Sequence, residues 1–107
     1  MPTVSAGSES GHLFKNSAGG VLAMYAVNRS SVAGFLVLID ASSIPADGSI
    51  TPLAVAPIQP NDIAVIEAFV TPIATSSGIV AVLTSAASPF TKTTSGGLTG
   101  FLSCQFR

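Results

Sequence analysis

One apolar run, Val32 to Asp40, constrains the fold of this chain more than any other stretch. It reads Val-Ala-Gly-Phe-Leu-Val-Leu-Ile-Asp and is rich in the β-branched and aromatic residues that suit a pleated sheet. The run is too short to cross a bilayer, because a membrane-spanning helix needs about 20 apolar residues. Asp40 and the turn sequence Pro45-Ala-Asp-Gly48 end it. These features predict a central β-strand buried on both faces.

Turn residues divide the rest of the chain into further strand candidates. These are residues 12–16, 21–27, 50–58, 63–70, 78–84 and 98–107, with loops predicted over 71–78 and 85–97. Asn28-Arg-Ser-Ser31 has the composition of a tight turn, which predicts an antiparallel hairpin over residues 21–40. Residues 98–107 alternate: Phe101, Gln105 and Arg107 share one face and Leu102 the other, as in a half-exposed antiparallel strand.

Two of these strand candidates, residues 50–58 and 63–70, contain or adjoin residues that disfavour a regular strand. Pro52 and Pro57 cannot donate hydrogen bonds to a neighbouring strand, so residues 50–58 are predicted to form an edge strand or a loosely paired one. For residues 63–70, a cap at Asn61 or Asp62 would also permit a short helix. The β-branched residues and Pro72 favour a strand.

The strand pattern predicts an all-β protein: an antiparallel β-sandwich of about seven to eight strands over residues 12–107. Residues 1–11 are predicted to be a flexible N-terminal arm, either disordered or ordered only on a neighbouring subunit. Several strands are apolar on both faces, and no long amphipathic helix is expected to cover the second face. We therefore expect a second copy of the chain to cover it, in a homo-oligomer of closed symmetry.

The composition argues against several classes of function. Only 8% of the residues are charged, against about 25% in ordinary soluble domains. This predicts a surface that is partly covered by partners and elsewhere coated with Ser, Thr, Ala and Gly. The formal charge of −1 offers no basic patch for nucleic acid or for anionic lipid, so we expect neither as a partner. A single cysteine, Cys104, excludes an intrachain disulfide. The first 11 residues lack the features of a secretory signal.

Residues with catalytic potential are few and scattered. The only histidine, His12, lies at the start of a strand beside the N-terminal arm. Asp40, Asp47 and Asp62 fall in turns, where local hydrogen bonding explains them; a calcium site would require their loops to meet. Glu67 shares a strand face with apolar residues, so we expect it to be paired or to lie at a subunit boundary. The partners considered for Glu67 are Arg29, Lys92 and Arg107. We therefore predict no enzyme, and no catalytic, cofactor-binding or metal residues.

The order of the segments resembles that of small virion structural proteins of tailed bacteriophages. The matching segments are Asn28-Arg-Ser-Ser31 with the Gly34–Ile39 strand, Asp40 to Gly48, Ile50-Thr-Pro52, Gly78 to Ser85, and Pro89-Phe-Thr-Lys-Thr93. The resemblance spans residues 12–106 and rests on turns and strands. It implies a β-sandwich of jelly-roll type that assembles as a homotrimer on a phage particle.

The function that this resemblance implies is that of a decoration or cement protein. Such a protein stabilises the capsid exterior, and its partners are other copies of itself and the major capsid protein or other virion proteins. It would be made in the host cytoplasm and located on the virion. The alternatives are a tail or baseplate component and a module that binds a host glycan. Phe90 is the only aromatic residue in the loops 71–78 and 85–97, so sequence support for glycan binding is thin.

Overall fold

The computed structural model describes residues 2–4, 10–68, 70–85, 88, 90–93 and 97–107 of the chain, with the backbone alone described for residues 2–4. The described part is all-β, and every strand pair in it is antiparallel. No helix in these ranges is long and apolar enough to cross a membrane. The strands are β1 (Pro2–Val4), β2 (Gly11–Lys15), β3 (Gly19–Asn28), β4 (Gly34–Ile39), β5 (Gly48–Ser49), β6 (Ala54–Ile58), β7 (Ile63–Glu67), β8 (Ile73–Thr75), β9 (Ile79–Thr84), β10 (Thr91–Lys92) and β11 (Gly100–Phe106).

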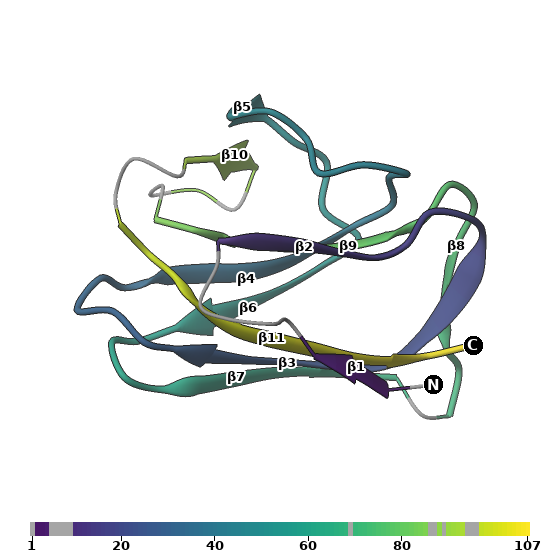
Figure 1. Cartoon of the computed structure of the whole chain (residues 1–107), viewed down its shortest axis with the longest axis horizontal. Helices are drawn as coiled ribbons and strands as arrows, with labels where there is room; N and C mark the ends of the chain where they lie inside the picture. Colours follow the sequence, from purple (N-terminus) through teal and green to yellow (C-terminus); the bar gives the residue numbers. More distant parts are fainter. Residues whose placement is uncertain (1, 5–9, 69, 86–87, 89, 94–96) are drawn as a thin grey trace.

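Two sheets face each other to form a β-sandwich (Figure 1). The first, here called the β3 sheet, has the strand order β1-β11-β3-β7, and β8 pairs with the other end of β3. The second, the β4 sheet, has the order β2-β9-β4-β6. The short pair β5–β10 lies beyond the β4 sheet, at the top of Figure 1. The predicted fold class, an antiparallel β-sandwich, is therefore confirmed.

The inner faces of the two sheets form one apolar core. Met24 from β3, Leu36 from β4, Leu83 from β9 and Leu102 from β11 are fully buried within it. Alternation along β11 places Leu102 and Cys104 in this core and leaves Phe101 exposed, as the sequence pattern predicts.

The predicted hairpin over residues 21–40 is wrong. β3 and β4 lie in opposite sheets, so the connection between them crosses the sandwich. Asn28, at the end of β3, is fully buried and donates hydrogen bonds to the carbonyl oxygens of Val32 (2.7 Å) and Gln59 (2.9 Å). Its side-chain oxygen accepts hydrogen bonds from the backbone N–H and the hydroxyl of Ser30. These bonds fold residues 28–32 into an arch in place of a hairpin turn.

The other strand predictions differ mainly in their ends. β6 lies at the edge of the β4 sheet and contains Pro57, which confirms the edge-strand prediction for 50–58. Residues 63–67 form a strand, so the strand interpretation is confirmed over the helix; Phe69 lies outside the described residues. The loops predicted over 71–78 and 85–97 contain the short strands β8 and β10. Short runs such as these carry too few residues to show a period.

The strands β4 and β9 are buried on both faces, as predicted for the Val32–Asp40 run, but their cover comes from the same chain. Val37, Ile39, Val80 and Val82 form a second cluster on the outer face of the β4 sheet. Ala41 and Ile50, from the connection between β4 and β6, pack on this cluster together with Leu13 and Phe35. A second copy of the chain is therefore not needed to cover the outer face of the β4 sheet.

Candidate interaction surface

None of the residues with catalytic potential come together in the described part of the chain. No group of three His, Cys, Asp or Glu side chains there could hold a metal ion. The ring of His12 packs against that of Phe14, with centroids 4.6 Å apart and planes inclined at 57°. A shallow depression of about 460 Å³ lies nearby and is lined by the consecutive residues Leu13 to Ser17. It brings no acid or histidine to Lys15, so it offers no pair of groups for acid–base chemistry.

Asp40, which follows β4, is hydrogen-bonded to the turn that precedes β9. Its carboxylate accepts hydrogen bonds from the backbone N–H groups of Ser76 (2.9 Å), Ser77 (2.8 Å) and Gly78 (3.1 Å), and from the Ser76 hydroxyl. Backbone hydrogen bonds, chiefly from Ser76 and Ser77, lower the pKa of Asp40 from 3.8 to about 2. The partners lie far along the chain, so the prediction of local turn bonding is wrong for Asp40. It is confirmed for Asp62, which accepts from the N–H of Ile63.

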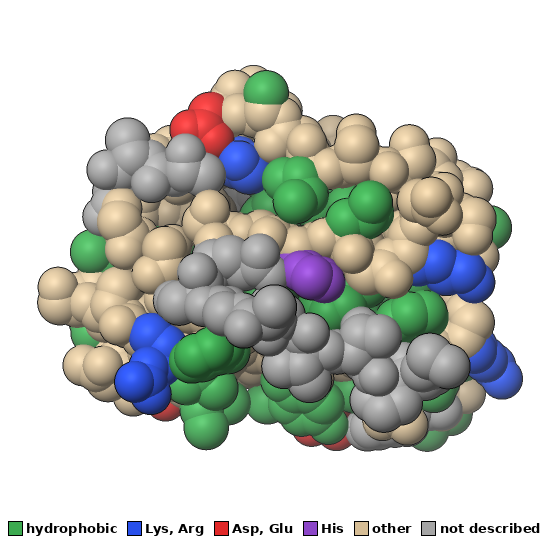
Figure 2. All heavy atoms as spheres, viewed as in Figure 1, with side chains coloured by type: hydrophobic (Ala, Val, Ile, Leu, Met, Phe, Trp, Pro, Cys, Tyr) green, Lys and Arg blue, Asp and Glu red, His purple; other side chains and the backbone are tan. Residues whose placement is uncertain are grey.

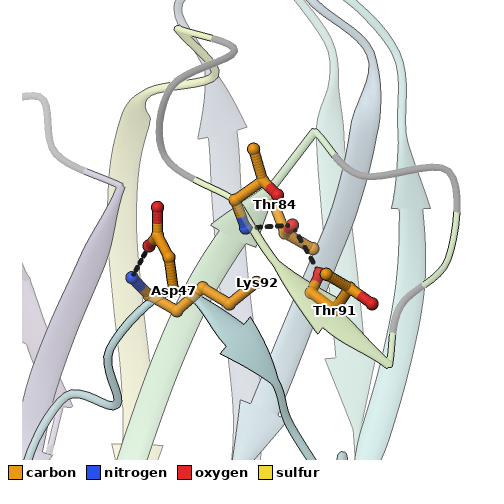
Figure 3. Close-up of polar contacts among 5 residues, drawn as sticks. Asp47, Thr84, Thr91 and Lys92 are labelled. Atoms are coloured by element: carbon orange, nitrogen blue, oxygen red, sulfur yellow. Dashed lines mark hydrogen bonds and ion pairs between the residues drawn. The ribbon is translucent and has the colours of Figure 1, made fainter.

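Asp47 and Lys92 fasten the β5–β10 pair. The Lys92 ammonium, with its side chain 6% exposed, lies 2.8 Å from Oδ1 of Asp47, whose side chain is 47% exposed (Figure 3). Beside them, the Thr84 hydroxyl donates to the Thr91 carbonyl (2.8 Å) and accepts from the backbone N–H of residue 93 (3.0 Å). The ion pair ties β10 to the residue before β5, and the Thr84 hydroxyl ties β10 to the end of β9, so the role of both groups is structural.

The outer face of the β3 sheet is where large apolar side chains are exposed side by side. Strand pairing places Phe101, Val27 and Ile63 in one row across β11, β3 and β7. The next row on the same face contains Ser103, Tyr25 and Val65. Ile63 is 62% exposed, and Tyr25, Val65 and Phe101 are each 37–38% exposed. We call these two rows the apolar rows of the outer face.

Figure 2 shows hydrophobic side chains gathered along the lower border of the molecule, where β11, β3 and β7 run, with charged groups beside them. Directly opposite residues on neighbouring strands have Cβ atoms about 5 Å apart, so the apolar rows form a continuous patch. Contiguous apolar patches on a folded chain are typical of protein–protein contact sites. The outer face of the β3 sheet is therefore the candidate functional surface.

Charged residues frame this surface. The Arg29 guanidinium lies 5.7 Å from the centre of the Phe101 ring, close enough for a cation–π contact. Glu67 follows Ile63 and Val65 on the exposed face of β7, opposite Ala23. The expected pairing of Glu67 with Arg29, Lys92 or Arg107 is not found among the described residues, where Lys92 pairs with Asp47.

The sequence held part of the signal for this surface. Alternation along 98–107 correctly separates the two faces of β11, and along 63–67 it places Glu67 on one face with Ile63 and Val65, which the structure shows to be exposed. What the sequence did not show is that β7 and β11 flank β3, because the expected hairpin placed 34–39 beside 21–27. Phe90, considered for glycan binding, is 63% exposed and lies away from this face, in the segment leading into β10.

No protein family, curated protein or solved structure was found to match this chain.

Proposed function

We propose that this protein is a structural subunit of a bacteriophage particle, a homotrimeric decoration or cement protein that stabilises the capsid exterior. The observation that carries the proposal is the exposed apolar outer face of the β3 sheet, on a chain with only 8% charged residues. A protein of this kind acts by burying surface between subunits, so it needs a contact face and no pocket.

The strand order adds support to the jelly-roll interpretation. Leaving out the short strands β5, β8 and β10, the remaining strands divide into sheets of order β1-β11-β3-β7 and β2-β9-β4-β6. A jelly roll is likewise two antiparallel four-stranded sheets joined by Greek-key connections. The phage assignment itself rests on the resemblance of the segments between residues 12 and 106.

The test compares particles of the encoding phage with particles from a deletion of this gene. We expect many copies of the protein per capsid, and DNA release from deletion particles at lower temperature and lower osmotic stress. Adding the purified protein back to deletion particles should restore the release temperature. Deletion particles of unchanged heat and osmotic stability would refute the cement role. Copies on isolated tails but not on heads would replace it with a tail or baseplate role.

A further inference from the structure

Four charged residues frame the apolar rows, and their signs divide between the two sides of the sheet. Arg29 packs over Phe101 on the β11 side, and Arg107 follows the last residue of β11, paired through its backbone with Gly20. Asp62 and Glu67 lie at the two ends of β7. We call Arg29, Phe101 and Arg107 the basic border, and Asp62, Ile63 and Glu67 the acidic border.

One acid and one base lie toward each end of the strands, and the match in level is closest for Arg29 and Asp62. Asp62 accepts a backbone hydrogen bond from Asn28, the residue before Arg29, so both charges lie at one end of β3. Glu67 pairs with Ala23, and Arg107 bonds to Gly20, so the second acid and the second base lie toward the other end. Within the described residues, none of the four charged side chains forms an ion pair.

We infer that the basic border of one copy binds the acidic border of the next copy, around a rotation axis that runs along the strands. Rotation about such an axis keeps every residue at its own level along the strands. It therefore brings Arg29 to Asp62 and Phe101 to Ile63 of the neighbouring copy. Arg107, at the level of Gly20, lies about 10 Å further along the strands than Glu67, at the level of Ala23, so only its long side chain can approach that carboxylate. Tyr25, in the central strand β3, then faces the axis.

The sheet allows this contact at both sides. On the acidic side, β7 is the last strand of the β3 sheet beside Ala23 to Val27, and β8 takes its place beside Gly19 to Val21. On the basic side, β1 pairs only with Ser103 to Gln105, so β11 is the border of the described sheet at the level of Phe101. Two different borders that fit each other make a head-to-tail interface, and such an interface closes into a ring when the rotation allows. Three copies give the trimer of the proposed function, on which this inference rests.

A second copy is the occupant that this charge pattern favours. Two bases on one side and two acids on the other complement each other within a single sequence, with the apolar rows between them. A strongly charged partner would be attracted to one border and repelled by the other.

Charge reversal tests the contact. In an Arg29→Glu/Arg107→Glu variant both borders are acidic, and in an Asp62→Lys/Glu67→Lys variant both are basic. Each should associate about 100-fold or more weakly than the natural chain, because like charges then face each other. Light scattering across a dilution series should show a mass near 10.7 kDa for each variant, and three times that value for the natural chain.

The chain carrying all four substitutions has exchanged borders and should recover the mass of the natural oligomer. Lys15→Glu, on β2 of the other sheet, is the matched control for Arg29→Glu and should leave the mass unchanged. Because Arg29, Asp62, Glu67 and Arg107 are exposed, the variants at these four positions should keep the far-ultraviolet circular dichroism of the natural chain.

Several outcomes would overturn the inference: a monomeric natural chain, a double reversal that leaves the mass unchanged, or a fourfold exchange that fails to recover it. These results are distinct from failure of the proposed function. An oligomer that ignores charge reversal but stabilises capsids refutes only the contact. An oligomer that obeys the exchange but leaves capsid stability unchanged refutes only the particle role.

Discussion

Replacing Asn28 by alanine should destabilise the sandwich more than any other single polar change near the arch. The side chain is fully buried and makes two donated and two accepted hydrogen bonds. Three of these bonds join it to backbone groups, at Val32, Gln59 and Ser30. A net value of about 1 kcal/mol for each gives a loss of about 3 kcal/mol.

A loss of this size is a large part of the stability of one domain, which is about 5–15 kcal/mol. It should lower the midpoint of thermal unfolding by about 12 °C or more, since each kcal/mol corresponds to about 4–8 °C for a domain of up to 100 residues. Urea unfolding followed by circular dichroism, at one fixed protein concentration, measures the free energy directly. The fixed concentration matters because self-association would add its own stabilisation.

Two further variants make the reasoning refutable. Asn28→Asp keeps the acceptor for Ser30 but turns a carboxylate oxygen toward the carbonyls of Val32 and Gln59, so it should be less stable than Asn28→Ala. Asn16→Ala, at an exposed position between β2 and β3, should change stability by less than about 0.5 kcal/mol. A variant Asn28→Ala within that same range, or an aspartate variant more stable than the alanine variant, would show that the arch does not depend on this side chain.

Four shorter predictions follow from individual contacts. Asp47→Ala should lower the free energy of unfolding in urea by about 2 kcal/mol, because it leaves the buried Lys92 ammonium without its carboxylate. Lys92→Met removes the buried charge itself and should lower it by less than about 1 kcal/mol. Equal losses in the two variants would contradict this reasoning. Gly48→Ala should cost about 1 kcal/mol, because φ at Gly48 is 130°, a conformation that alanine adopts only with strain. No atom lies within 4 Å of the position that the added methyl group would take, so a steric clash adds nothing to this cost. A neutral effect would mean that the turn is misassigned. The ionised Asp40 stabilises the fold above its unfolded pKa of 3.8, and this gain is lost as the pH falls toward about 2, so Asp40→Asn should flatten the pH dependence of stability between these values. Burial raises the pKa of Cys104 to about 12, so its thiol should react with iodoacetamide at pH 8 only after unfolding; labelling of the native protein would contradict its burial.

The candidate surface shows where sequence reasoning stops. Alternation placed Phe101 and Arg107 on one face of a half-exposed strand, and Glu67 on one face with Ile63 and Val65 of another. It could not bring the two strands to opposite sides of β3, because that arrangement depends on pairings across 35 residues or more. The charge division between the borders is therefore visible only once the sheet is assembled.

The sequence by itself determined that residues 34–39 and 79–84 form strands buried on both faces, that β6 lies at an edge, and that a turn containing Gly48 follows the first of these strands. These properties are local, because they follow from side-chain size, the period of two and the chemistry of proline and glycine. Tertiary structure decided which strands pair and what covers them. The buried amide of Asn28 holds, through its hydrogen bonds to Val32 and Gln59, the connection by which the chain passes from one sheet to the other. Ala41 and Ile50 cover the outer cluster on the β4 sheet. Such contacts join residues that no local pattern connects. The exposed apolar face is therefore the outer face of the β3 sheet, whereas the sequence predicted an uncovered apolar face on the strands that became β4 and β9.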